Sequence, residues 1–183
     1  MDVKYKITFN SQSFIIKELA ISAIVFLIGY LVLVKYYDPG EEIMSAIICL
    51  TVYVVLQLIP SLILHLQYLK YNKTTSFSIN ESERIMSITD TNMTSSYGFD
   101  QIKYIWLITT YPLYRGARRG IGAWQLYHYS VIEMKDGKQF VVSCLLVNNQ
   151  EKFYDALKLQ TYKRTLFYPL IYTKWDRSYT FNI

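Results

Sequence analysis

The residues best suited to bind an anion lie in one stretch of this 183-residue chain, YPLYRGARRGIGAWQ at 111–125. Glycines let backbone amides approach an anion, and arginines supply paired donors to a phosphate or carboxylate. Because three of the seven glycines break the local pattern here, we expect a flexible loop. A mobile, solvated loop without a ligand is the alternative. The candidate residues for anion, lipid or partner binding are Arg115, Gly116, Arg118, Arg119 and Gly120.

A second polar group lies inside an apolar segment. Gln57, Ser61 and His65 follow one another at intervals of four residues, which puts them on one face of a helix. Pro60 removes a backbone hydrogen bond among them, so the helix should kink there. The polar face either lines a path toward another helix or holds a helix pair together.

Residues for catalysis or for a metal are few. The chain has two histidines and two cysteines, and Cys49 and Cys144 lie in segments of different character, so we expect neither a disulfide nor a metal site. The sequence carries no P-loop, paired-carboxylate motif or nucleophile elbow. We therefore predict a protein that is not an enzyme and needs no cofactor.

The feature that best predicts where the protein is located is a pair of apolar segments. Residues 19–34 carry no charge, residues 43–69 carry none if His65 is neutral, and the polar stretch 35–42 separates them. About 20 apolar residues span a hydrocarbon core of about 30 Å. We expect a two-helix transmembrane hairpin over 14–69, and neither a cleaved signal peptide nor a buried helix pair of a soluble protein.

The basic residues predict the orientation of this hairpin. Lysines precede the first helix and follow the second, whereas the connection 35–42 has one lysine against three acidic residues. By the positive-inside rule both termini are cytoplasmic, in a multi-pass protein of the cell's inner (plasma) membrane. The net charge of +5 resides mainly in residues 70–183, which favours contact with an anionic leaflet. Since the chain is held at a membrane, we expect no nucleic-acid partner.

After residue 70 the apolar period changes from helical to alternating, which is typical of strands. Asn148 is placed to cap a helix over 149–161. The leader 1–13 is either a strand joining the sheet or a disordered segment, and the basic, aromatic tail 162–183 is either interfacial or strand-forming. The expected strands are 75–80, 84–89, 93–97, 101–110, 127–134 and 139–146.

The order of elements, together with YGFDQIK at 97–103 and FVVSCLLV at 140–147, resembles the bacterial pleckstrin-homology-like (PH-like) membrane proteins of the YcxB-like kind. Asp100 and Ile102 hold the places of that family's strand-opening motif. The resemblance implies a membrane α-helical hairpin plus an antiparallel β-sheet or barrel closed by one C-terminal helix, with the cytosolic PH-like domain over 70–161. The acidic turn at 80–83 departs from the phosphoinositide motif of eukaryotic relatives, so headgroup binding of that kind is not implied.

These observations predict a non-catalytic module that binds an unknown protein partner or the anionic membrane surface. The alternative is a small transporter or channel subunit, in which several hairpins form a homo-oligomer and the polar face at 57, 61 and 65 lines a path.

Overall fold

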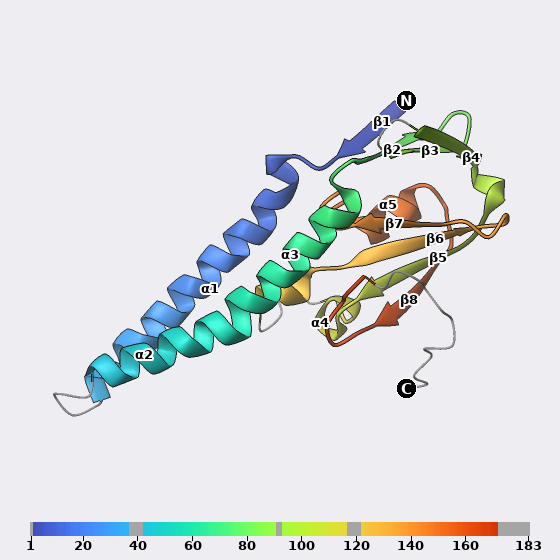
Figure 1. Ribbon diagram of the computed structural model, residues 1–183. Helices are drawn as coiled ribbons and strands as arrows, with labels where there is room; N and C mark the ends of the chain where they lie inside the picture. Colours follow the sequence, from blue (N-terminus) through green and yellow to red (C-terminus); the bar gives the residue numbers. More distant parts are fainter. Residues whose placement is uncertain (1, 37–41, 91–92, 117–121, 172–183) are drawn as a thin grey trace.

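Two long helical stretches project side by side from one end of a β-sheet domain (Figure 1). The computed structural model describes residues 2–36, 42–90, 93–116 and 122–171. The first stretch is α1 (Phe9–Tyr36). The second runs through α2 (Glu42–Tyr53), the π-helical η1 (Val54–Leu58) and α3 (Ile59–Asn72), and it delivers the chain into the domain.

The backbone is irregular where a kink was expected. Pro60 lies in the first turn of α3, directly after the π-helical turn η1. Proline has no N–H to donate and crowds the preceding turn, and a wider π turn is one way for a helix to accommodate such a defect. The polar residue Gln57 lies within this turn and is buried.

The first sheet has the strand order β1 (Asp2–Lys6), β2 (Thr75–Asn80), β3 (Ile85–Asp90) and β4 (Met93–Gly98), all antiparallel. Of the two expectations for the leader, the strand is therefore the one observed. Because β1 pairs directly with β2, the whole helical hairpin is an insertion in the connection between two neighbouring strands.

The second sheet has the order β7 (Gln139–Ser143), β6 (Tyr129–Met134), β5 (Ile102–Thr109) and β8 (Thr161–Thr165). β5 is apolar on both faces, as suits a strand with neighbours on both sides, and it lies between β6 and β8. β8 runs parallel to β5, so the tail begins with a strand of this sheet.

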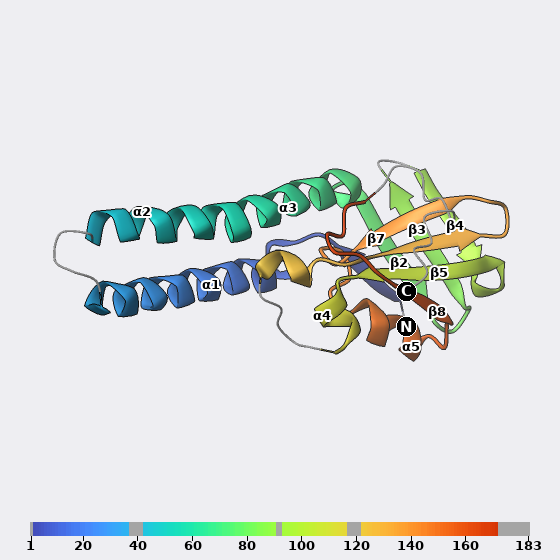
Figure 2. The same cartoon turned by 90° about the horizontal axis from the view of Figure 1, so that it is seen from below.

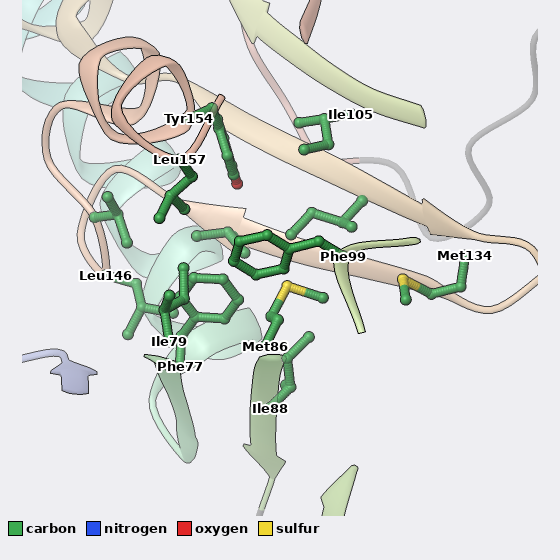
Figure 3. Close-up of a cluster of buried hydrophobic side chains, with 13 residues drawn as sticks. Phe77, Ile79, Met86, Ile88, Phe99, Ile105, Met134, Leu146, Tyr154 and Leu157 are labelled. Carbon is green, nitrogen blue, oxygen red and sulfur yellow. The ribbon is translucent and has the colours of Figure 1, made fainter. Parts of the chain in front are cut away.

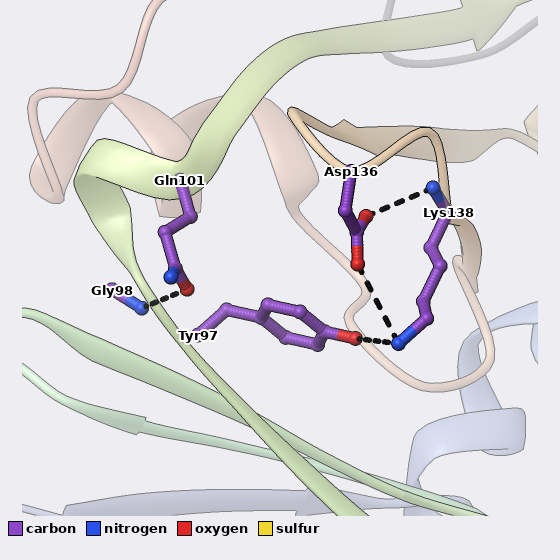
Figure 4. Close-up of polar contacts among 5 residues, drawn as sticks. All are labelled: Tyr97, Gly98, Gln101, Asp136 and Lys138. Atoms are coloured by element: carbon purple, nitrogen blue, oxygen red, sulfur yellow. Dashed lines mark hydrogen bonds and ion pairs between the residues drawn. The ribbon is translucent and has the colours of Figure 1, made fainter.

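Turn residues fix the β-hairpin formed by β6 and β7. Between β6 and β7, Gly137 takes a φ of +87° and the Asp136 carboxylate accepts from the Lys138 amide at 3.0 Å. The Lys138 ammonium also reaches the Tyr97 hydroxyl of β4 at 3.2 Å, which ties the two sheets together at the end of the domain far from the helices (Figures 2 and 4).

Two sequence predictions were wrong in detail. The helix expected over 149–161 is α5 (Gln150–Ala156), capped by Asn149 rather than Asn148. It ends early because Lys158 adopts a left-handed φ of +55°, and the Lys158 and Leu159 amides donate back to the Asp155 and Tyr154 carbonyls, which closes the helix.

The stretch 111–125, expected to be a flexible loop, contains regular structure in its described residues. It forms the helical turn α4 (Tyr111–Tyr114) and enters the 3₁₀ turn η3 (Ala123–Leu126). A further 3₁₀ turn, η2 (Phe99–Gln101), joins the two sheets.

The apolar side chains form two clusters. The sheet core lies between the two sheets and α5, and Phe77, Met86, Phe99, Ile132 and Tyr154 are among its members (Figure 3). A second group, the base cluster, lies between the second sheet and the ends of α1 and α3 that are nearest to the domain. There Ile15 and Leu64 contact Tyr68, Tyr127 and Tyr129. The base cluster therefore fixes the domain to the helices.

Candidate functional site

The polar face of the second helical stretch is covered by the domain. The Gln57 side chain is 3% exposed, and its Oε1 accepts from the Ala123 amide of η3 at 3.2 Å. Gly122 permits this approach, because a Cβ there would lie 2.8 Å from Gln57 Oε1. Ser61 is fully buried one turn further along, and its Oγ has no hydrogen-bond partner among the described residues.

His65 continues this face and joins three elements. Its Nε2 lies 2.9 Å from Gln12 Oε1, and its Nδ1 lies 2.9 Å from the Tyr127 hydroxyl. An amide oxygen can only accept, so Nε2 carries the proton and Nδ1 accepts from Tyr127. The structure thus brings Gln57, Ser61 and His65 together at the contact between helices and domain.

The segment after β8 lies against α3 and is held there by hydrogen bonds that the sequence did not indicate. Gln67 both donates to the Ile171 carbonyl at 2.9 Å and accepts from its amide at 3.0 Å. The Tyr68 hydroxyl donates to the Pro169 carbonyl at 2.8 Å. These partners lie about a hundred positions apart in the sequence, so no local spacing could have indicated them.

Aromatic side chains gather on the edge of the domain beside the helices. Trp124 of η3 contacts the rings of Phe167 and Tyr168, with centroids 5.4 and 5.7 Å away. The Tyr168 hydroxyl donates to the Pro60 carbonyl, which fixes the group to α3. We call Tyr111, Tyr114, Arg115, Trp124 and Phe167 the hairpin-side edge; Phe167 is 84% exposed.

The predicted arginine site falls only partly on described residues. Arg115 is the C-cap residue that follows α4, is exposed, and places its guanidinium 5.2 Å from the centre of the Tyr111 ring. Gly116 follows with a φ of +73°. Arg118, Arg119 and Gly120 lie outside the described residues, so the anion-binding role of this set stays a prediction.

Beyond the domain, both helical stretches expose apolar side chains. By length and composition, the segments Gln12–Tyr36 and Ile43–Asn72 are long and apolar enough to cross a membrane. In the first, none of the most apolar window is buried by the rest of the chain. Large aliphatic side chains such as Val25, Leu31, Ile47 and Leu56 are more than half exposed.

The described residues offer little for metal binding or for nucleophilic chemistry. The part of the chain that is described contains no group of three histidine, cysteine or acidic residues placed to hold a metal ion. Cys49 and Cys144 are both free, and burial raises the pKa of the Cys144 thiol to about 12, so it is not a reactive thiolate.

The domain consists of an antiparallel sheet and a mixed sheet that enclose one core, with the short helix α5 following β7. The antiparallel prediction for the sheet is thus corrected at β8, which pairs in parallel with β5. The PH domain family matches residues 4–153, which include the helical hairpin, and the chain belongs to that family. Neither a search of curated proteins nor one of solved structures finds a significant match. PH domains are generally non-catalytic modules that bind lipids or proteins.

Proposed function

We propose that this protein is a membrane-anchored, non-catalytic PH module whose helical hairpin spans the bilayer and whose hairpin-side edge rests on the anionic membrane surface. The observation that carries the proposal is a group of aromatic residues, among them the exposed Phe167, beside the exposed apolar helices. Trp124, which is partly exposed, contacts Phe167 and Tyr168, and the Tyr168 hydroxyl donates to the Pro60 carbonyl. Large aliphatic side chains such as Leu62 still face outward at this level of the helices.

The helix lengths agree with this placement. At 1.5 Å per residue the stretch from Glu42 to Asn72 is about 46 Å long, which exceeds the hydrocarbon core of about 30 Å. The excess lies at the domain end, where Leu64, Tyr68 and Asn72 are buried. Tryptophan and tyrosine favour the boundary between hydrocarbon and head groups, and arginine favours anionic lipids.

The orientation proposed is that of the positive-inside rule, with both termini and the PH domain in the cytoplasm of a bacterium and the connection 35–42 outside. A protein partner, the other binding function expected from the sequence, would use a surface that the membrane leaves free. The oligomeric transporter or channel is not adopted, because Gln57 and His65 bind residues of the same chain's domain and Ser61 between them is fully buried.

Depth-dependent fluorescence quenching tests the membrane contact. The full-length chain is reconstituted in anionic vesicles with Trp106→Phe and Trp175→Phe, which leaves Trp124 as the only tryptophan. Lipids brominated near the head group should quench Trp124 more strongly than lipids brominated near the chain end.

The matched control keeps Trp106 alone, with Trp124→Phe and Trp175→Phe. Trp106 lies on β5, where it packs with Tyr104 and Tyr162 rather than with the hairpin-side edge. Equal quenching of the two tryptophans, or release of the chain from membranes by alkaline carbonate, would overturn the proposal.

A further inference from the structure

The two sheets leave a groove between their outer strands, β4 and β7. Each of these has one hydrogen-bonded neighbour among the described strands, since β4 pairs with β3 and β7 pairs with β6. At the end far from the helices the two strands are in contact, because the Tyr97 and Phe140 rings lie 5.4 Å apart. Nearer the helices a cavity of about 500 Å³ lies between them, lined also by Tyr71 and Asn72 of α3, and we call it the edge groove.

The walls of the edge groove present apolar surface that the rest of the domain leaves open. Tyr71 of α3 and Phe140 and Val141 of β7 line it and are partly exposed. Met93 of β4 lines it as well and is 80% exposed. Exposed apolar side chains beside the open edge of a sheet are the features that bind a further strand.

The open edge of β7 also offers backbone groups. Asn72 donates to the Val141 carbonyl and accepts from the Ser143 amide, so these two groups face away from β6. The amide and carbonyl of one residue point to the same side of a strand, and the side alternates along it. The Val141 amide and both backbone groups of Gln139 therefore point to the open edge, where an added strand could pair with them.

The described part of the chain ends beside this groove. Ile171 makes two hydrogen bonds to Gln67 of α3, and Tyr71 follows Gln67 by one helical turn, which is about 6 Å. Twelve residues follow, 172–183, and when extended they reach about 40 Å. The five residues of β7 span about 17 Å, so this final segment is long enough to lie along the whole groove.

The sequence of the final segment has the period of a strand. From residue 174 to residue 182 every even position is polar. The odd positions hold Trp175, Arg177, Tyr179, Phe181 and Ile183. In an extended conformation such a segment has one face that is mainly aromatic and apolar, which needs an apolar surface to cover it.

We propose that residues 172–183 bind in the edge groove of their own chain as an added strand, with the aromatic face toward Met93 and Phe140. The added strand runs antiparallel to β7, because β7 ends beside α3 and the final segment begins there. It bridges β4 and β7 and closes the open side of the domain. The proposal does not rest on the membrane contact of the hairpin-side edge.

Residue-resolved hydrogen exchange of the full-length chain in detergent tests the proposal. The Val141 amide should exchange about tenfold more slowly than in a chain that ends at Ile171, because only the longer chain pairs with it. The Val142 amide points to β6 and serves as the internal control. A synthetic peptide of residues 172–183, added to the shortened chain, should restore the protection of Val141, and a scrambled peptide should not.

Substitutions within the final segment separate its two faces. Tyr179→Ser combined with Phe181→Ser removes two rings from the aromatic face and should speed the exchange of the Val141 amide about tenfold. The matched control, Thr180→Ser combined with Asn182→Ser, changes the polar face and should leave the exchange unchanged. These variants keep the length of the chain, so they apply even if the shortened chain does not fold.

A second pair of variants tests the opposite wall of the groove. Met93→Lys places a charge where the aromatic face should bind and should release the final segment, whereas Thr94→Lys lies on the other face of β4 and should not. Thermal unfolding checks that each variant is folded.

Equal exchange of the Val141 amide in the full-length and shortened chains would refute the proposal. Protection that is lost on dilution would also overturn it, because the groove would then bind the final segment of a second copy. Exchange that responds equally to changes on the two faces of the segment would rule out a strand with its aromatic face in the groove.

Discussion

We expect Asn72 to stabilise the contact between α3 and the second sheet. It is 2% exposed at the end of α3, and its side chain lies along the open edge of β7. Its Nδ2 donates to the Val141 carbonyl at 2.9 Å, and its Oδ1 accepts from the Ser143 amide at 3.0 Å. The side chain thus pairs with two backbone groups of β7 that would otherwise need a neighbouring strand.

Replacing Asn72 by alanine leaves two backbone groups of β7 without partners. Each unpaired buried group costs about 1–3 kcal/mol, and some access of water reduces the sum, so we expect a loss of about 2–4 kcal/mol. For a chain of this size 1 kcal/mol lowers the melting temperature by about 2–4 °C. The expected shift is therefore about 4–16 °C.

Thermal unfolding of the full-length protein in detergent measures this shift. The control is Asn80→Ala, which removes a hydrogen bond to the Glu83 amide in the exposed turn between β2 and β3 and should cost less than about 1 kcal/mol. A shift for Asn72→Ala no larger than that of Asn80→Ala would mean that the edge of β7 does not need this residue.

Two other substitutions test other contacts of the domain. Gly122→Ala should destabilise the protein by about 1–3 kcal/mol, because the new Cβ would lie 2.8 Å from Gln57 Oε1 and 2.5 Å from Trp124 Nε1. Gly29→Ala, with nothing within 4 Å, should not, and equal melting points for the two variants would count against the close approach. Burial lowers the pKa of His128, so its imidazole stays neutral in the folded protein. Its contribution to stability is therefore present above about pH 6.5 and is lost as the pH falls from there toward the lowered pKa. Melting curves from pH 7.5 to 5 should show a smaller loss for His128→Gln than for the native chain, and identical slopes would contradict the assignment.

Much of the fold could be predicted from the alternation of apolar and polar residues and from the turn residues between strands. Phe77, Ile79, Met86 and Ile88 alternate with polar residues, and all four are buried in the sheet core. The Asp136–Gly137 turn likewise marked the hairpin that is observed. These features are local, because each depends on the period of one strand or on the φ angle of one turn.

The candidate site was less predictable. The spacing of Gln57, Ser61 and His65 predicted that they share one face of the helix. It did not predict what covers that face, since the partners Ala123 and Tyr127 are more than sixty residues away. The composition of the tail 162–183 is equally compatible with a strand and with an interfacial segment, and the structure describes it as far as residue 171. Its pairing with β5 and its hydrogen bonds to Gln67 and Tyr68 decide the matter.

The sequence by itself determined two long apolar helices, the charge difference between their ends, and most of the strands, because these follow from composition and from periods of 3.6 and 2 residues. Only the tertiary structure decided that the hairpin is inserted between the paired strands β1 and β2, and that the domain covers the polar face of the helices. Those features arise from contacts between residues far apart in the chain, whose free energy depends on where the whole fold brings them.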